Sequence, residues 1–512
     1  MDSSILDPDY AQRVSMIGSW WSTNGKRLIS TLSRICWALF LVTLPVSSFP
    51  FFPDDIGGGT LVRPLSIYPL IILLLLVILP RLLTKPIPKT ILSFLPFVII
   101  AVVSSLLATL RGIEALQGVS VMVRMFRALA TLGVGGAIYL VVTLWPVNKE
   151  DLRFSLRWLY AGFVLAMFWG TLQALYVVQF SPRWFDLMSS VQRYISIRRL
   201  FTNRVSGLTY EPNWFADQIS LLLLPWLLAA VLSGYTVFKW RWRWATIELF
   251  LLGWALALLP FTFSRAGLIV MMVLVLMGVL FFRSKMTDDS QETKSTRRFP
   301  WRRIGEAAVL VVILGAVIFF AGSRNEFFAR IWEYWQRTPN QGYVRYITNY
   351  FEYLGFGARY TYMETAYQVY DDYPILGVGL GNYAFYFDEK LPDRPLAAIP
   401  EVLRLVVPEA GNSRLITPKN LILRVMAEMG MLGLATFIAF IMAILGCALY
   451  LWFSPNIEVK FWGVGGILGL IAFGLVAFSF DSFAIPNMWV VFGLITAAMR
   501  LSKRQFPVGG KI

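Results

Sequence analysis

The chain has 512 residues, of which 57% are apolar and 15% are charged, and Lys and Arg outnumber Asp and Glu by 46 to 30. Ordinary soluble domains have about 45–50% apolar and about 25% charged residues. The composition therefore excludes a soluble enzyme, a disordered protein and a secreted disulfide scaffold, and it predicts an all-α polytopic membrane protein. In such a protein, cytoplasmic Lys and Arg that orient the helices explain a net charge of +16, so we expect no nucleic-acid partner.

The side-chain inventory limits the chemistry. The sequence has no histidine, which removes the commonest general base and the usual metal ligand. The two cysteines, Cys36 and Cys447, lie in apolar runs, where we expect buried thiols and neither a disulfide nor a thiolate metal site. We therefore expect no metal and no cofactor, and a chemistry that uses carboxylates, Arg, Lys, Tyr or backbone groups.

Apolar stretches predict about twelve transmembrane helices, because a spanning helix needs about 17–25 mostly apolar residues. Residues 1–29 are too long and too polar for a cleavable signal peptide and are predicted to form a cytoplasmic tail. The last two spans are the least certain, because Asp481 and Pro486 leave only a tight turn between them. The predicted spans are 30–49, 64–80, 90–110, 119–145, 154–178, 214–233, 244–260, 266–282, 305–322, 420–450, 462–480 and 484–500.

The distribution of Lys and Arg orients these spans. Residues 283–303 carry seven Lys and Arg, so the positive-inside rule places this segment in the cytoplasm, and alternation then places both termini there. The resulting organisation is helices 1–9 within 30–322, a large outward loop at 323–415, helices 10–12 within 416–500 and a cytoplasmic tail at 501–512. Within the large loop, we expect short amphipathic helices at 325–335 and 358–370.

One short outward loop opposes the orientation rule. Residues 179–213 carry five arginines but only two acidic side chains. Because these charges work against the predicted orientation, we expect the arginines to have a use at the outer face; the alternative is ordinary loop chemistry.

Two motifs at the outer face could bind an anion. In the segment 204–213, Pro212 suits the first turn of a helix, whose free N–H groups would lie near Arg204 and could hold a diphosphate. In the segment 262–267, Arg265 is one of few basic residues in a short outer loop. The structural alternatives are a capped helix beside a solvated arginine, and an arginine that anchors its helix at the interface.

A third motif covers residues 359–383 and ends in a turn-rich segment with Gly377, Gly379 and Gly381. It is not a dinucleotide-binding fingerprint, because it does not follow a strand in a βαβ unit. Glycines here would let the backbone approach a ligand or a neighbouring helix.

A fourth motif opens the tenth span, where Lys419 and Asn420 lie at the outer mouth and Glu428 lies about two turns deeper. A carboxylate at this depth suggests a functional site unless it pairs with Arg424 on the same helix face. Arg124, together with Arg127 in the fourth span, could face a polar cavity, partner Glu428 or lie nearer the interface.

In this order, the motifs resemble the O-antigen ligase and O-antigen polymerase family of bacterial surface polysaccharide assembly. The resemblance covers residues 200–450 in detail. The family signatures appear here as Arg204…Pro212-Asn213, Ser264-Arg265-Ala266-Gly267, Arg359…Pro374-Ile375-Leu376-Gly377-Val378-Gly379-Leu380-Gly381 and Lys419-Asn420…Glu428-Met429-Gly430.

The resemblance implies a metal-independent glycosyltransferase of the bacterial inner membrane. Its donor would be a glycan on polyprenyl diphosphate and its acceptor a sugar hydroxyl on the periplasmic side. Its partners would be lipid-linked oligosaccharide, membrane lipids and other polysaccharide-assembly proteins. Family ligases carry a histidine where this sequence has Lys419, so a polymerase is favoured over a ligase. The alternatives are a small-anion transporter, since some family members are named as bicarbonate transporters, and a non-catalytic membrane scaffold.

The expected catalytic residues are three arginines and one carboxylate. Arg204, Arg265 and Arg359 would bind the diphosphate more tightly as its charge grows, which lowers the barrier. Glu211 is the first candidate for the base that activates the acceptor hydroxyl, and Glu428 is the second. The expected substrate-binding residues are Tyr210, Asn213, Ser264, Lys419, Asn420 and Glu428, and Tyr210, Tyr360 and Tyr383 could stack on sugar rings.

Overall fold

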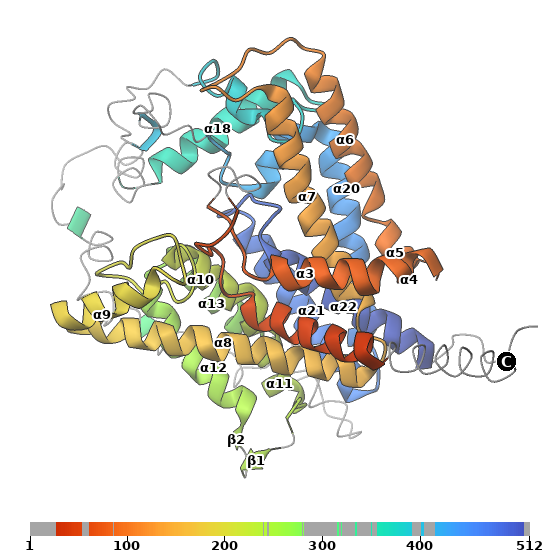
Figure 1. The fold of residues 1–512 in the computed structure, drawn as a ribbon, viewed down its shortest axis with the longest axis vertical. Helices are drawn as coiled ribbons and strands as arrows, with labels where there is room; N and C mark the ends of the chain where they lie inside the picture. Colours follow the sequence, from red (N-terminus) through yellow and green to blue (C-terminus); the bar gives the residue numbers. More distant parts are fainter. Residues whose placement is uncertain are drawn as a thin grey trace, which may run out of the picture.

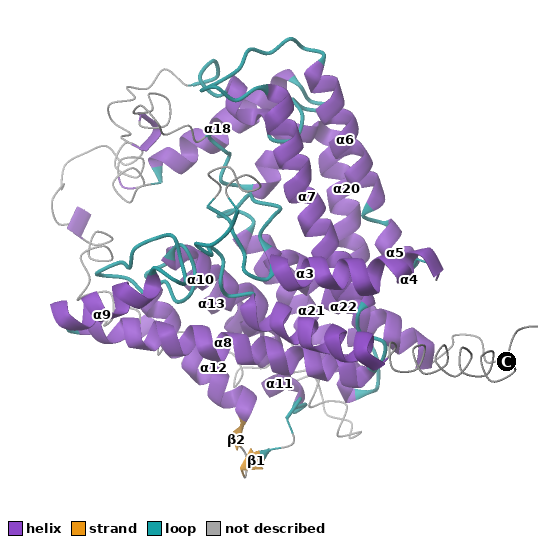
Figure 2. Ribbon diagram, viewed as in Figure 1, coloured by secondary structure: helices purple, strands orange, loops and turns teal. Residues whose placement is uncertain are grey.

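The computed structural model describes residues 27–53, 61–84, 87–238, 240–242, 245–278, 280, 315–316, 319, 333–334, 350, 356–391, 401–403 and 415–505. Across these residues the protein is built of helices (Figure 2). The strands within this part of the chain are β1 (Arg241–Trp242) and β2 (Ala245–Thr246), which pair as a short antiparallel hairpin. The all-α prediction is confirmed.

Helices coincide with every predicted span except 305–322, which lies largely outside the described residues. Seven of them are long and apolar enough to cross a membrane, and Ile247–Thr262 and Arg265–Met277 are shorter apolar helices. The count of twelve spans stays a prediction. The seven helices are Ile67–Thr84, Lys89–Thr109, Val121–Leu144, Lys149–Val178, Pro212–Ser233, Leu421–Trp452 and Ile457–Val476.

Figure 1 labels the α-helices and the two strands of the described residues. Residues 27–43 are also helical. The remaining helical elements are α3 (Ile67–Leu73), η1 (Leu74–Ile78), α4 (Leu79–Thr84), α5 (Lys89–Leu92), α6 (Leu95–Thr109), α7 (Val121–Leu144), α8 (Lys149–Val178), α9 (Pro182–Gln192), α10 (Pro212–Gln218), η2 (Ile219–Leu223), α11 (Leu224–Ser233), α12 (Ile247–Leu258), η3 (Leu259–Thr262), α13 (Arg265–Met277), α18 (Gly357–Asp372), η5 (Asn382–Tyr386), α20 (Leu421–Trp452), α21 (Ile457–Val476) and α22 (Pro486–Gln505).

Several of the predicted boundaries differ from the helix ends. Helical structure already begins at residue 27, inside the predicted N-terminal tail, and α22 continues past residue 500 to Gln505. Hydropathy detects the apolar core of a span but not the amphipathic turns that extend it, such as the turn in which Lys503 packs over the ring of Tyr450. Both cysteines are free and buried, as predicted.

The helix that begins at Pro212 has an irregular middle. Residues Ile219–Leu223 form a π-helical turn between α10 and α11. Pro225 explains it, because proline has no N–H to donate to the carbonyl four residues earlier and its ring crowds that carbonyl. The wider turn offsets α10 from α11 within the candidate span Pro212–Ser233.

Small residues let the central helices approach closely. A Cβ on Gly135 of α7 would lie 2.2 Å from the Trp489 ring of α22, and a Cβ on Gly463 of α21 would lie 2.2 Å from the Trp452 backbone of α20. Helices in a bilayer associate mainly through such close packing, since lipid is as apolar as their side chains. Figure 1 shows α6, α7 and α20 side by side, with α18 beside their upper ends.

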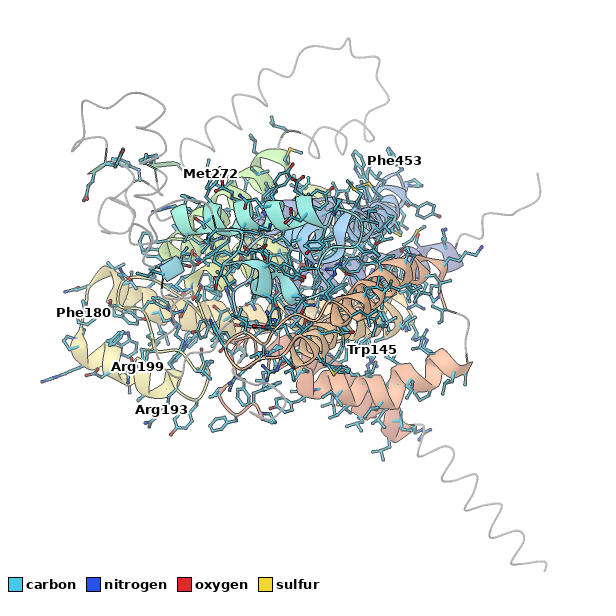
Figure 3. The ribbon with its side chains drawn as sticks, turned by 90° about the horizontal axis from the view of Figure 1, so that it is seen from above. Trp145, Phe180, Arg193, Arg199, Met272 and Phe453 are labelled. Carbon is cyan, nitrogen blue, oxygen red and sulfur yellow. The ribbon has the colours of Figure 1, made fainter. Side chains whose placement is uncertain are left out.

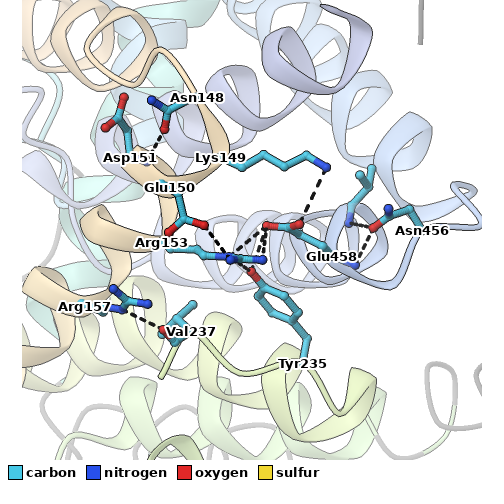
Figure 4. A network of polar contacts seen from close by, with 11 residues as sticks. Asn148, Lys149, Glu150, Asp151, Arg153, Arg157, Tyr235, Val237, Asn456 and Glu458 are labelled. Carbon is cyan, nitrogen blue, oxygen red and sulfur yellow. Dashed lines mark hydrogen bonds and ion pairs between the residues drawn. The ribbon is translucent and has the colours of Figure 1, made fainter. Parts of the chain in front are cut away.

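A polar network joins the start of α8, the segment after α11 and the start of α21 (Figure 4). The Glu458 carboxylate of α21 accepts hydrogen bonds from Arg153 of α8 at 3.1 Å and from Tyr235 at 3.0 Å, and Lys149 lies 3.7 Å away. These residues come from segments predicted to face the cytoplasm. The network therefore shows that those segments share one side of the molecule, while the cytoplasmic location of that side stays a prediction.

Candidate functional site

Arg204 lies in the loop before α10 and binds three oxygen atoms. It donates to the Thr262 carbonyl at 2.9 Å, to Asn213 Oδ1 at 2.8 Å and to the Phe263 carbonyl at 3.4 Å. Helix α10 begins at Pro212, as the sequence predicts. The predicted substrate-binding residue Asn213 therefore holds Arg204 in place and joins its loop to the first turn of the helix.

The surroundings of Arg204 favour an anion. Burial lowers the pKa of Arg204 to about 10, and the nearby guanidinium groups of Arg265 and Arg198 act in the same direction, while Glu211 opposes them. The side chain stays positively charged at neutral pH. A partly desolvated cation among other cations gains more from a bound anion than an exposed cation does.

Helix α13 brings Arg265 to the same place. Ser264 is the N-cap residue, and its Oγ accepts a hydrogen bond from the Gly267 amide at 3.2 Å. A Cβ on Gly267 would lie 2.5 Å from Cβ of Ala216, so α13 packs directly against α10. The predicted substrate-binding residue Ser264 thus caps the helix and presents Arg265 as its first residue.

Helix α18 supplies the third arginine. Phe356, just before this helix, lies under the Arg265 guanidinium, 5.8 Å from the ring centroid. Arg359 follows one turn later and donates to the Ser479 carbonyl at 3.5 Å. Arg204 and Arg265 therefore lie at the adjoining ends of α10 and α13, and Arg359 lies three residues after the ring that contacts Arg265.

The predicted base Glu211 is engaged elsewhere. Its carboxylate accepts a hydrogen bond from Arg198 at 2.5 Å. The Arg198 guanidinium packs over two rings, 4.6 Å from the centroid of Phe201 and 4.9 Å from that of Tyr210. Tyr210 also packs against Trp214. Both Glu211 and Tyr210 thus take part in holding this loop together.

The fourth motif has structural contacts throughout. Asn420 caps α20 by accepting from the Leu423 amide at 3.1 Å, and the Lys419 amide donates to Asp481 Oδ2 at 2.7 Å. Glu428 is 1% exposed, and its carboxylate accepts a hydrogen bond from Arg424 at 2.9 Å. This is the intrahelical pair that the sequence left open as the structural alternative.

The glycines of the third motif approach neighbouring helices. Gly377, Gly379 and Gly381 all have positive φ, and a Cβ on any of them would overlap α20, α6 or α7 respectively. Ser104 of α6 and Gly379 both donate to the Glu428 carbonyl, which fixes the turn against these helices. Two roles were open for these glycines, and the structure shows the approach to a neighbouring helix.

One aromatic residue predicted to stack on sugar rings cannot do so in this structure. Tyr383 is completely buried, and its hydroxyl donates to the Tyr362 carbonyl at 2.8 Å. A sequence pattern does not reveal this, because the ring is enclosed by α18 and the turn after it. Tyr360 is 54% exposed and retains an open face. Arg124 donates to the Gly381 carbonyl at 2.9 Å, so it anchors the same turn.

Residues 250–438 match the O-antigen ligase family. This match supports the O-antigen ligase and polymerase family, which the sequence motifs resemble. No curated protein matches the sequence. The matched region includes Arg265 and Arg359. Arg204 lies before it in the sequence but donates hydrogen bonds to the carbonyls of Thr262 and Phe263 within it. The matched family is one of membrane enzymes of polysaccharide assembly, and the match gives no support to the transporter alternative.

The structure adds a carboxylate that the sequence analysis missed. Asp217 is 6% exposed and lies at the end of α10, one turn after Asn213. It lines a small cleft between α10, the segment before α3 and the start of α22. The available signal was an ionisable residue inside a predicted span, which suggests a functional site by default. The cleft is lined by Ser47, Val62, Pro64, Trp214, Asp217, Gln218, Val476, Phe480, Ile485, Pro486 and Asn487.

Proposed function

We propose that this protein is a glycosyltransferase of the bacterial inner membrane, with both termini in the cytoplasm. It transfers a glycan from a polyprenyl diphosphate carrier to a sugar hydroxyl on the periplasmic side. The proposal rests on Arg204 and Arg265 at the adjoining ends of α10 and α13, and on Arg359 of α18, a helix whose preceding residue, Phe356, packs under Arg265.

The chemistry follows from the leaving group. As the bond between the anomeric carbon and the diphosphate oxygen breaks, negative charge grows on the diphosphate. Guanidinium groups bind phosphate oxygens with paired, charge-assisted hydrogen bonds, and the benefit increases as charge develops. Three arginines can supply this positive charge without a metal ion. Arg204 is held by backbone carbonyls and Asn213, so little reorganisation is needed when the diphosphate binds.

A polymerase reaction is favoured over transfer to lipid A. The position that carries a histidine in family ligases is Lys419 here, and the backbone of Lys419 is bound to Asp481. A polymerase would take a second lipid-linked glycan as the acceptor. Lipid-linked oligosaccharide is therefore the proposed partner on both sides of the reaction.

The test uses a deletion strain complemented with Arg204→Ala, Arg265→Ala or Arg359→Ala. Surface glycan is examined on gels and lipid-linked precursor is quantified. Losing one transition-state hydrogen-bond donor lowers turnover by about 10²–10³. We therefore expect loss of polymerised glycan and accumulation of precursor in all three variants.

Arg193→Ala and Arg199→Ala are matched controls, because both arginines are exposed and belong to the same net-positive loop. Figure 3 shows both at the periphery of the molecule. These variants should polymerise normally. Normal glycan in the Arg204, Arg265 and Arg359 variants, at wild-type protein levels, would overturn the proposal.

A further inference from the structure

The cleft beside α10 has polar walls whose oxygen atoms lack partners. Asp217 Oδ1, Gln218 Oε1 and Asn487 Oδ1 are buried, and none has a hydrogen-bond partner among the residues that the structure describes. All three residues line the cleft and are at least nine-tenths buried. Buried polar groups without partners are costly, so such a concentration at one cleft calls for a ligand that satisfies them.

The orientation of Gln218 shows which of its polar atoms lacks a hydrogen-bond partner among the described residues. Its Nε2 donates to the Leu44 carbonyl at 3.3 Å, which fixes the amide and leaves Oε1 as the unpartnered atom. Asp217 contributes a carboxylate oxygen, which in its ionised form can only accept. The cleft therefore offers acceptors and requires a ligand with several donors. Trp214 adds an aromatic side chain to the wall.

Sugar hydroxyls are the donors that fit both the cleft and its position. Arg359 acts electrostatically on Asp217, and Arg359 donates to Ser479, next to Phe480 in the cleft wall. The cleft therefore adjoins the arginine cluster without being lined by those arginines. A glycan whose hydroxyls entered it would lie beside a diphosphate held by the arginines.

We infer that this cleft binds the acceptor glycan and that Asp217, in place of Glu211, accepts the proton of its attacking hydroxyl. This inference rests on the proposed function. The hydroxyl oxygen forms a bond to the anomeric carbon of the donor, and the bond from that carbon to the diphosphate breaks with its electron pair leaving on the diphosphate. The hydroxyl proton passes to Asp217 Oδ1 and then to solvent. Gln218 and Asn487 accept hydrogen bonds from neighbouring hydroxyls and orient the ring.

The first test compares Asp217→Asn with Arg265→Ala in purified protein. The probe is the lipid-linked precursor that accumulates in the deletion strain. Removing a general base lowers turnover by about 10²–10⁴. We expect Asp217→Asn to lose transfer to this extent but to retain bound precursor through the arginine cluster, whereas Arg265→Ala should lose both transfer and precursor retention.

Glu248→Gln is the matched control, because it makes the same carboxylate-to-amide change at a buried residue remote from the cleft. Glu248 is 1% exposed and accepts hydrogen bonds from Thr236 and the Val237 amide near β1. It should transfer normally. If Asp217→Asn transfers like the wild type and Arg265→Ala does not, the inference is overturned and the proposed function stands. If both variants transfer like the wild type, the inference and the proposed function are both overturned.

A second readout does not depend on activity. Both native cysteines are buried, so Ile485→Cys, at a half-buried position of the cleft wall, introduces the one accessible thiol among the described residues. A small, charged methanethiosulfonate reagent should label this thiol, and added precursor should slow the labelling several-fold. Labelling that precursor leaves unchanged, in a variant that still retains precursor, would show that the glycan does not enter the cleft and would overturn the inference.

Discussion

Arg204 donates to Asn213 Oδ1 across 2.8 Å, and this bond joins the arginine loop to the start of α10. Asn213→Ala removes the acceptor, and a hydrogen bond to a charged group contributes about 1.5–3 kcal/mol. We expect a lower apparent melting temperature in detergent and weaker precursor retention. Asn213→Asp keeps an acceptor oxygen and should melt close to the wild type. Equal melting of Asn213→Ala and wild type would show that the bond does not hold the loop.

The close approach of Gly377 to α20 predicts a severe effect of an added methyl group. Gly377 has φ +65°, and a Cβ there would lie 2.4 Å from the Glu428 carbonyl carbon. Gly234 also has φ +65°, but a Cβ there meets nothing within 4 Å. Gly234→Ala should cost only the backbone strain, about 1–2 kcal/mol.

Gly377→Ala should add overpacking of about 1–3 kcal/mol or more to the same strain. We expect a strong loss of folded protein, measured as the monodisperse fraction in fluorescence-detected size-exclusion chromatography. Comparable yields of the two alanine variants would contradict the packing of this turn against α20.

The buried pair between Arg424 and Glu428 predicts a stability effect that a purely catalytic carboxylate would not show. Glu428→Ala leaves the Arg424 guanidinium buried without its carboxylate, and breaking a buried ion pair costs about 3–5 kcal/mol. The double variant Arg424→Met with Glu428→Ala removes both charges and should recover much of the loss. Thermal unfolding of the two single variants and the double variant measures the coupling. Additive losses would contradict the pair.

The contacts of Asp481 predict a pH dependence of stability. Burial raises the pKa of Asp481, but Lys419, Arg424 and hydrogen bonds from Thr417 and the Lys419 amide outweigh it and leave the pKa below its ordinary value. A carboxylate with a depressed folded-state pKa stabilises the fold above the unfolded pKa of about 3.9, and this contribution is lost as pH falls through the folded pKa.

Melting temperature measured from pH 7 down to pH 3 checks this prediction. The wild type should keep the contribution of Asp481 until the pH is below about 4. Asp481→Asn should be less stable at pH 7, and the difference from the wild type should shrink at the acid end. A difference that stays constant with pH would show that the charge of Asp481 is not what stabilises the turn.

The helices and the outer-face motifs could be predicted from the sequence because they depend on neighbours along the chain. Apolar runs locate the described spans, Pro212 begins α10, and Ser264 and Asn420 cap the helices that follow them. The family resemblance likewise rests on short segments. These features require no knowledge of how the helices are rotated or which of them touch.

Only the tertiary structure decided which polar side chains are engaged. Glu211 and Glu428, the two carboxylates that the sequence favoured, are paired with Arg198 and Arg424, whereas Asp217 lines a cleft with one oxygen unpartnered among the described residues. The clustering of Arg204 with Arg265 also depends on the packing of α10 against α13. Hydropathy averages over a helix, but pairing depends on which face of each helix meets a segment distant in sequence.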